Sequence, residues 1–352
     1  MVNSTFRFIT VCLALFFGSL DVGAQSPTPA KRPAETRKPT PAVKLETEPE
    51  SQPKVIDKEA SPQLRKVERK EMKVTPSTLG GEEFSFRYKL DSGMVISSEV
   101  THLAKTDTKI DSAEQNSHSR TVSQKIWEIT KFENGQMTFE YKIIEIDMSQ
   151  RIGDETEIRF NSKSGEEPAR QFQSAADSVG KVISVVTIDE QGLIVARSDD
   201  TNPPNLGMGD ITLPVPKEPI AVGATWEVPR ELRIRREDGS VKTVRFRELF
   251  RFDKVSAGVA TVAVRSEMLT AISEPKEEAQ VLQQLSNGTI RFDIDAGRMI
   301  SKELSWDKVV VGFSGPGSVM DYSARLDEQV INASQKPVPS RATSKSKLGT
   351  RR

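Results

Sequence analysis

The chain has 352 residues, with 50 basic and 50 acidic side chains, one cysteine and a mean hydropathy of −0.45. The cysteine, Cys12, lies in an apolar N-terminal run, so a chain cleaved after that run has no thiol. Disulfides, cysteine zinc sites and thiol nucleophiles are then excluded. Although the net charge of the chain is zero, its charge is unevenly distributed. Residues 73–330 carry a net charge of −9, residues 25–72 carry +3 and residues 331–352 carry +6.

The N-terminus has the features of a secretory signal peptide. One arginine precedes an apolar run, residues 8–17, which is too short to span a bilayer. Small residues, Val22 and Ala24, stand at positions −3 and −1 of a cleavage site between Ala24 and Gln25. Because no cysteine follows the run, a lipid anchor is not expected. The sequence predicts a periplasmic or secreted protein without a transmembrane segment in its mature form.

Two basic, proline-containing segments flank the central region and are predicted to be disordered. In the first, residues 25–72, only residues 63–72 have a composition compatible with a short charged helix. The second, residues 331–352, is a basic tail without any acid. Its cations are Lys336, Arg341, Lys345, Lys347, Arg351 and Arg352. Such arms can attract anionic envelope components, whereas their lack of aromatic residues argues against nucleic acid as a partner.

The first half of the central region is predicted to consist of strands and one helix. An alternating run at 84–90 predicts a strand with its aromatic residues on one face. Asn-Gly at 134–135 predicts a hairpin over 122–146. A short strand at 158–161 precedes a helix over 168–179, and a second hairpin covers 182–195.

The second half repeats this order after a turn-rich connection at 199–209 and a new strand at 222–228. A hairpin is predicted at 249–264, a helix at 275–285 and a strand–turn–strand at 289–300. Strands at 303–311 and 319–326 complete the sheet.

These elements predict one domain over 73–330, made of similar halves at about 83–198 and 222–328. The fold class is mainly β (α+β). We expect a curved antiparallel sheet or incomplete barrel, built from two hairpin–helix–hairpin repeats with one helix per half.

Four short segments resemble a domain-of-unknown-function family of exported proteins found widely in planctomycete bacteria. They lie at 88–93, 158–163, 185–192 and 219–227, and the resemblance covers about 80–330 but not the arms. It implies export and no known activity. The predicted shape is also similar, at the level of fold, to the half-open barrels of periplasmic lipoprotein carriers.

Motifs that could carry chemistry are better explained by structure. His102 and His118 are placed in a polar stretch between strands, with no metal ligand at a suitable spacing. Asp293 and Asp295 fit a hairpin turn rather than a calcium loop. Ser314 lies in a Gly-rich stretch that lacks the spacing of a nucleophile elbow. The three tryptophans fall on strand patterns and are predicted to pack in the core; these are Trp127, Trp226 and Trp306.

The sequence therefore predicts an exported, non-catalytic envelope protein that binds an apolar ligand in a groove of the sheet. No catalytic residue, cofactor or metal is assigned. The alternative is a structural or tethering envelope protein that acts through its basic arms and uses the β domain as a spacer.

Overall fold

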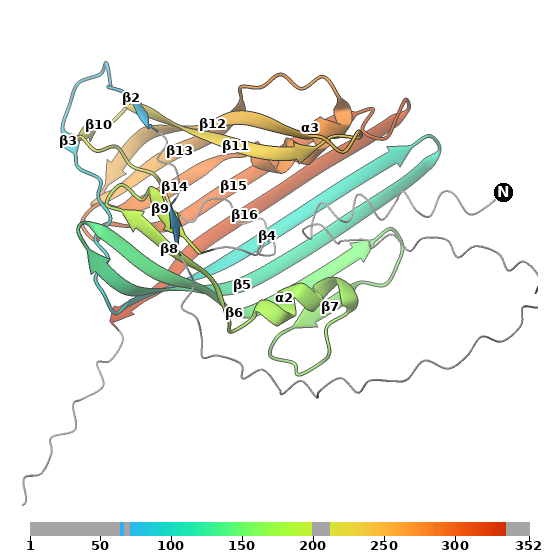
Figure 1. Cartoon of the computed structure of the whole chain (residues 1–352), viewed down its shortest axis with the longest axis horizontal. Helices are drawn as coiled ribbons and strands as arrows, with labels where there is room; N and C mark the ends of the chain where they lie inside the picture. The colour runs from blue at the N-terminus through green and yellow to red at the C-terminus, as the bar shows by residue number, and fades with distance from the viewer. Residues whose placement is uncertain (1–63, 67–70, 199–211, 336–352) are drawn as a thin grey trace, which may run out of the picture.

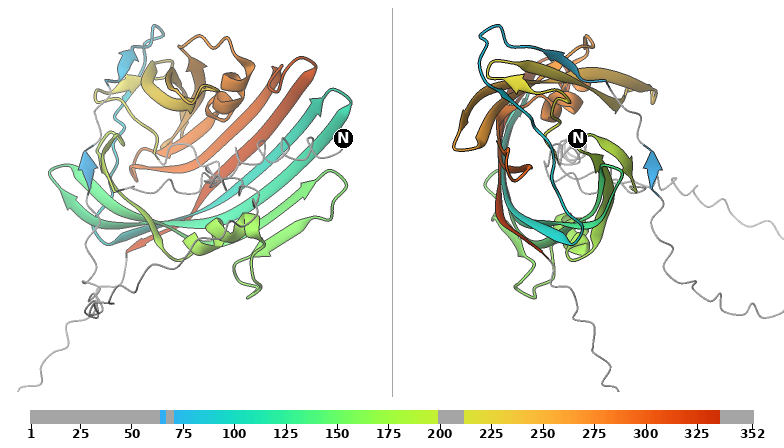
Figure 2. Two further views of the ribbon diagram at one scale, coloured as in Figure 1. Left: turned by 45° about the vertical axis from the view of Figure 1, so that its right-hand side comes forward. Right: turned by 90° about the vertical axis from the view of Figure 1, so that its left-hand side faces the viewer.

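The computed structural model describes residues 64–66, 71–198 and 212–335. Strands dominate these residues and only two helices occur among them, which confirms the predicted fold class. All but two of the strands form one large antiparallel sheet that curves strongly without closing on itself (Figures 1 and 2).

The sheet is ordered so that its two halves meet in the middle. From one edge to the other the order is β1-β9-β8-β6-β5-β4-β16-β15-β14-β13-β12-β11-β2, with β7 paired to β6. The first-half strands are β1 (Arg65–Lys66), β4 (Met94–Ile110), β5 (Ala113–Glu133), β6 (Gln136–Ile152), β7 (Ile158–Asn161), β8 (Val182–Asp189) and β9 (Ile194–Arg197). The second-half strands are β11 (Thr225–Arg235), β12 (Val241–Ser256), β13 (Val259–Met268), β14 (Asn287–Asp293), β15 (Arg298–Val311) and β16 (Ser318–Gln335), with β2 (Lys73–Thr75) at the edge. β16 joins the halves because it pairs with β15 on one side and with β4 on the other.

Both halves follow the predicted hairpin–helix–hairpin order. In the first half, β5 and β6 lead through α2 (Gln173–Ser178) to β8 and β9. In the second half, β12 and β13 lead through α3 (Pro275–Val281) to β14 and β15. The first hairpin of each half turns through two residues with positive φ, Asn134–Gly135 in one half and Ala257–Gly258 in the other. Left-handed pairs of this kind match the twist of the strands that they connect.

The predicted strand at 84–90 is wrong in its placement, although its alternation is real. Only Glu83–Phe84 is a strand, β3, and it pairs with β10 (Ile220–Ala221) outside the large sheet. Residues 85–91, the crossing segment, run across the concave face of the sheet (Figure 2). Phe86, Tyr88 and Leu90 are buried there because they pack down onto the sheet instead of joining its hydrogen-bond ladder.

Two further expectations need correction. The stretch that holds His102 and His118 was predicted to connect strands, but it forms most of β4 and the start of β5. The disordered segment predicted at 25–72, with its helix at 63–72, includes Arg65–Lys66, which forms β1 and pairs with β9. Long strands tolerate polar residues when their partners on both sides complete the hydrogen-bond ladder, and β4 has such partners in β5 and β16.

Both helices lie on the concave side, near the end of the sheet opposite to the crossing segment (Figure 1). α2 follows a 3₁₀ turn at Arg170–Phe172 and is shorter than the predicted helix at 168–179. Phe172 and Ala175 pack on Ile146 and Met148 of β6. α3 continues into a 3₁₀ turn, Leu282–Gln284, and together they match the predicted helix.

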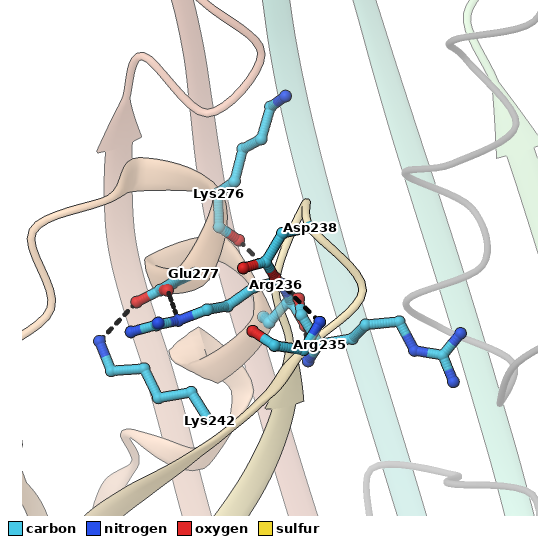
Figure 3. Close-up of polar contacts among 8 residues, drawn as sticks. Arg235, Arg236, Asp238, Lys242, Lys276 and Glu277 are labelled. Carbon is cyan, nitrogen blue, oxygen red and sulfur yellow. Dashed lines mark hydrogen bonds and ion pairs between the residues drawn. The ribbon is translucent and has the colours of Figure 1, made fainter.

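A carboxylate anchors α3 to the hairpin between β11 and β12 (Figure 3). Glu277 accepts a hydrogen bond from Lys242 Nζ at 2.6 Å and one from Arg236 Nε at 3.0 Å. Gln280, one turn later, exchanges hydrogen bonds with the backbone of Arg235. The helix is thus fixed at a defined position over the second half of the sheet.

Candidate functional site: a buried charged cluster on the concave face

The crossing segment covers one end of the concave face, which we call the capped end. Phe86 packs edge-on against Phe252, with 5.1 Å between ring centroids, and Tyr88 packs edge-on against Phe292 at 5.3 Å. Tyr88 N donates to the carbonyl of Glu190, and its hydroxyl accepts from the backbone of Leu213. The segment therefore ties both halves of the sheet together at this end.

The apolar lining is interrupted midway along the strands by a polar stripe that crosses four neighbouring strands. Lys125 on β5 lies directly opposite Ser98 on β4, and Glu328 on β16 lies directly opposite Lys302 on β15. All four side chains are buried, and Lys125 is only 2% exposed. We call these four residues the buried charged cluster.

Both oxygens of the Glu328 carboxylate are engaged within this cluster. Ser98 Oγ donates to Oε1 at 3.0 Å, and Lys302 Nζ lies 3.2 Å from Oε2. Burial raises the pKa of Glu328, but the charges of Lys302 and Lys125 and the Ser98 hydrogen bond outweigh it, and the pKa lies below its usual range. Glu328 is therefore an ionised carboxylate in the interior.

Lys125 has a different environment. Among the described residues, none offers it a hydrogen-bond acceptor or a carboxylate oxygen at ion-pair distance. Its Nζ lies 6.0 Å from the centroid of the Tyr141 ring. Burial lowers the pKa of Lys125 to about 7; the negative charge of Glu328 opposes this change and the positive charge of Lys302 adds to it. The ammonium therefore gains and loses its proton near neutral pH.

An imidazole and an indole lie beyond the cluster, on the side away from the capped end. The rings of His102 on β4 and Trp306 on β15 meet edge to face at 6.2 Å. Burial, together with the positive charge of Lys125, lowers the pKa of His102 to about 4. His102 is thus neutral at physiological pH. Trp306 Nε1 donates to the carbonyl of Gln283, which links this layer to the turn after α3.

Two buried polar atoms still farther along the same face have no hydrogen-bond partner within the described part of the chain. They are Thr106 Oγ1 on β4 and Gln150 Oε1 on β6. Buried polar atoms without partners are uncommon and costly. The concave face therefore runs from an aromatic layer at the capped end, through the buried charged cluster, to a layer with unsatisfied polar atoms.

Glu277 provides a useful contrast with Glu328. Each carboxylate faces two cations, but Arg236 is 42% exposed and Lys242 is 18% exposed, so the cations of Glu277 reach solvent. Lys302 is 5% exposed at its side chain, and Lys125 is buried as well. The Glu277 contacts therefore anchor a helix near the surface (Figure 3), whereas the surplus ammonium of the Glu328 cluster is confined to the interior.

A shallow groove of about 490 Å³ lies mainly on the convex side, across β16, β4 and β5. Its cations already have acidic partners: Lys105 pairs with Asp107, and Arg120 pairs with Asp147. We therefore regard this groove as an ion-paired surface.

Several residues singled out in the sequence have structural roles. Asp293 Oδ1 accepts from the backbone of Ala296 in the β14–β15 turn, and Ser314 lies in the turn between β15 and β16. The three tryptophans are buried in the core, as predicted. His102 and His118 lie on opposite faces of the sheet. His102 lies directly opposite Thr121 and shares its face, whereas His118 is an odd number of residues away from Thr121 on the same strand and points to the other face. Within the described ranges, no group of three or more His, Cys, Asp or Glu residues could hold a metal ion.

The cleavage residues Ala24 and Gln25 and the six cations of the basic tail lie outside the described residues. Across residues 64–66, 71–198 and 212–335, no helix is both long enough and apolar enough to cross a bilayer.

Sequence reasoning missed the buried charged cluster. The signal that could have found it is the alternation of side chains along a strand. Lys125 is two residues from both Ser123 and Trp127, so it points to the same face as a core tryptophan. Glu328 stands in the same relation to Leu326. A charged residue in phase with core residues indicates a buried charge, but the pairing of four strands could not be read from any one of them.

Comparisons with known proteins identify no family. Neither the protein-family models nor the curated proteins match this sequence. Among solved structures, lipovitellin aligns over 72% of this chain with 9% identity and a TM-score of 0.33, and the chain spans only 27% of lipovitellin. The translocator domain of the autotransporter NalP from Neisseria meningitidis aligns over 68% of this chain and 89% of its own, with 8% identity and a TM-score of 0.26. DynF from the dynemicin biosynthesis pathway of Micromonospora chersina aligns over 72% and 88%, with 6% identity and a TM-score of 0.20. Similarities this remote carry no functional argument.

Proposed function

We propose that this chain is an exported, non-catalytic envelope protein that binds an apolar ligand on the concave face of its curved sheet. One observation carries the proposal: the concave face combines apolar side chains with a polar stripe that crosses it midway along the strands. Binding sites for small apolar molecules have this composition, in which apolar walls supply affinity and a few polar groups fix orientation. The signal-peptide features at residues 1–24 support export.

The arrangement of the elements supports binding on this face in preference to the convex one. The crossing segment closes the capped end, and α2 and α3 lie over the concave side at the other end. An occupant of the concave face would therefore be enclosed by protein at both ends. The convex face carries charged side chains in ion pairs, such as that between Arg325 and Asp327.

Native mass spectrometry of the protein purified from its own envelope fraction tests this function. We expect a polypeptide mass that begins at Gln25, together with an additional mass that disappears on denaturation. A polypeptide mass that still includes residues 1–24 would contradict export. A bare polypeptide from fully native preparations would contradict the binding function.

The division of charge along the chain favours one alternative, a tethering protein whose basic arms bind an anionic envelope component. Residues 331–352 carry +6, whereas residues 73–330 carry −9. Deletion of residues 331–352 separates the two functions. Loss of envelope association with unchanged ligand mass would favour tethering, and unchanged association would favour the β domain.

A further inference from the structure

The charge count of the buried cluster is uneven. Two ammonium groups, on Lys125 and Lys302, share one carboxylate, Glu328. Transfer of a charge from water into a protein interior costs several kcal/mol unless a counter-charge and hydrogen bonds compensate it. Within the described chain, the cluster therefore lacks one negative charge when both lysines are protonated.

The geometry shows which cation lacks it. Ser98 occupies one oxygen of Glu328 and Lys302 occupies the other. Lys125 is on the next strand, opposite Ser98, so the serine stands between it and the carboxylate. Its ammonium has three donors, and among the described residues it has no acceptor and lies 6.0 Å from the centroid of the Tyr141 ring. The missing group is thus an acceptor beside Lys125.

The surroundings of Lys125 define the rest of the ligand. Trp127 and Ile129 follow it on β5 toward the capped end, and Trp127 stacks on Phe139 with centroids 4.6 Å apart. On the other side lie Ser123 on β5 and Val100 on the adjacent strand β4, both buried. Toward the capped end, an acceptor at Lys125 is therefore bordered by apolar walls, which suit an acyl chain and not a compact polar ion.

We propose that Lys125 receives the monoanionic head group of a single-chain amphiphile, a fatty acid carboxylate, whose chain lies along the apolar concave face. One carboxylate supplies the one missing charge, and its oxygens accept from an ammonium that has no other acceptor in the described chain. The unpartnered Thr106 Oγ1 and Gln150 Oε1 mark the same face as one with further polar contacts to offer. The assignment rests on the proposed binding function and adds the class of the ligand.

A matched pair of probes tests the assignment. 12-Bromododecanoate and 12-bromo-1-dodecanol have the same chain and differ in the head group, and bromine quenches tryptophan fluorescence on contact. Trp127 and Trp306 face the concave side, so binding of either probe is read as saturable quenching. We expect the wild-type protein at pH 7 to bind the carboxylate at least tenfold more tightly than the alcohol.

Substitutions assign this preference to one side chain. Lys125→Met should bind both probes with equal affinity, close to that of the wild-type protein for the alcohol. Lys105→Met removes an exposed lysine on the convex face of β4 and should leave the preference unchanged. If Lys125→Met binds neither probe, Lys125→Arg decides, because it keeps the charge. A retained preference for the carboxylate supports the assignment, and a lost one overturns it.

The remaining outcomes separate the two proposals. If the wild-type protein binds both probes equally, the binding function stands and the head-group assignment fails. If the carboxylate is preferred and Lys125→Met keeps that preference, another group receives the head and the assignment also fails. If neither probe binds the wild-type protein, the binding function itself fails.

Discussion

A lysine at position 125 lowers the stability of the folded protein, because its charge is buried. Its neighbours in phase on β5, Ser123 and Trp127, are buried, and a core residue of similar length would fill the same space without a charge. Replacement of buried ionic groups by apolar residues of similar volume often stabilises a protein by about 1–4 kcal/mol. A charged residue that lowers stability at such a site is typical of a residue with a function.

We therefore predict that Lys125→Met stabilises the protein by about 1–4 kcal/mol at pH 6. The pKa of Lys125 is about 7 in the folded protein and 10.5 when unperturbed, so the unfolded state binds the proton more tightly. The burial penalty is complete below pH 7 and disappears as the pH rises toward 10.5. The advantage of the variant over wild type should shrink over that range, as measured by urea denaturation at pH 6, 8 and 9.5. A Lys125→Met protein that is less stable than wild type at pH 6 would show that the charge is compensated.

Binding of the carboxylate probe should depend on pH for the same reason. An anion beside Lys125 favours its protonated form, so above pH 7 binding takes up a proton and affinity falls up to tenfold per pH unit. Among the described residues, the other ionisable groups that face Lys125 are Glu328, Lys302, His102 and Tyr141. His102 has a pKa of about 4 and burial raises that of Tyr141, so neither changes charge between pH 7 and 9. The alcohol probe should show no such dependence, and equal pH profiles for the two probes would contradict this prediction.

At the scale of the elements, the crossing segment depends on close approach to the β8–β9 turn. Gly192 has φ +73°, and a Cβ there would lie 2.4 Å from Tyr88 Cε2 and 2.8 Å from the carbonyl oxygen of Leu213. Gly180, before β8, has a similar φ of +77° with open space around it. Alanine substitutions at these two glycines therefore distinguish the cost of backbone strain from the cost of a steric clash.

Gly180→Ala should cost roughly 1–2 kcal/mol, the penalty of a left-handed conformation for alanine. Gly192→Ala should cost a further 1–3 kcal/mol or so, because the added methyl displaces Tyr88 and the backbone at Leu213. Thermal or urea unfolding of the two variants checks the difference. Equal destabilisation would mean that the crossing segment is not packed against this turn.

A second prediction at the scale of the elements concerns Glu277, whose carboxylate anchors α3. Glu277→Gln removes the negative charge that Lys242 and Arg236 share, so α3 should open more often and its amides should exchange faster with deuterium over residues 275–281. Glu278→Gln, in the same helical turn but exposed, is the matched control and should leave exchange unchanged. Exchange that does not differ between the two variants would show that the apolar contacts of α3 suffice to hold it.

The elements that could be predicted from sequence are those whose signals are local. Asn134–Gly135 fixes a hairpin through two left-handed residues, and Pro275 marks the start of α3. β4 was missed because its concave face includes Ser98 and Thr106, so the apolar alternation is broken. The crossing segment was predicted as a strand because Phe86, Tyr88 and Leu90 alternate like one. Whether an alternating segment pairs with a sheet or lies across it depends on distant strands.

At the scale of the whole molecule, β16 joins the two repeats into a single sheet. It pairs with β15 of the second half and, along its length, with β4 of the first. A continuous ladder of this kind should prevent either half from unfolding alone.

We predict a single cooperative transition for both halves. Trp127 reports on the first half and Trp226 on the second, and each can be isolated by Trp→Phe substitution of the other two tryptophans. In each variant, fluorescence and far-UV circular dichroism should give the same urea midpoint. A fluorescence midpoint displaced from that of circular dichroism in either variant would show that the halves unfold independently.

The position of β16 in the chain also determines when the sheet can be completed during folding. Each repeat can form from neighbouring hairpins, but the strand pair that joins them brings together residues as far apart in the sequence as Met94 and Gln335. Contacts between such distant residues close slowly because loop entropy must be lost first. Until β16 is in place, the unpaired edges of β4 and β15 are open to pairing with other chains. Newly synthesised chains should therefore pass through a half-assembled state in which β4 and β15 are most susceptible to aggregation, and a chaperone that shields these two edges would accelerate productive folding.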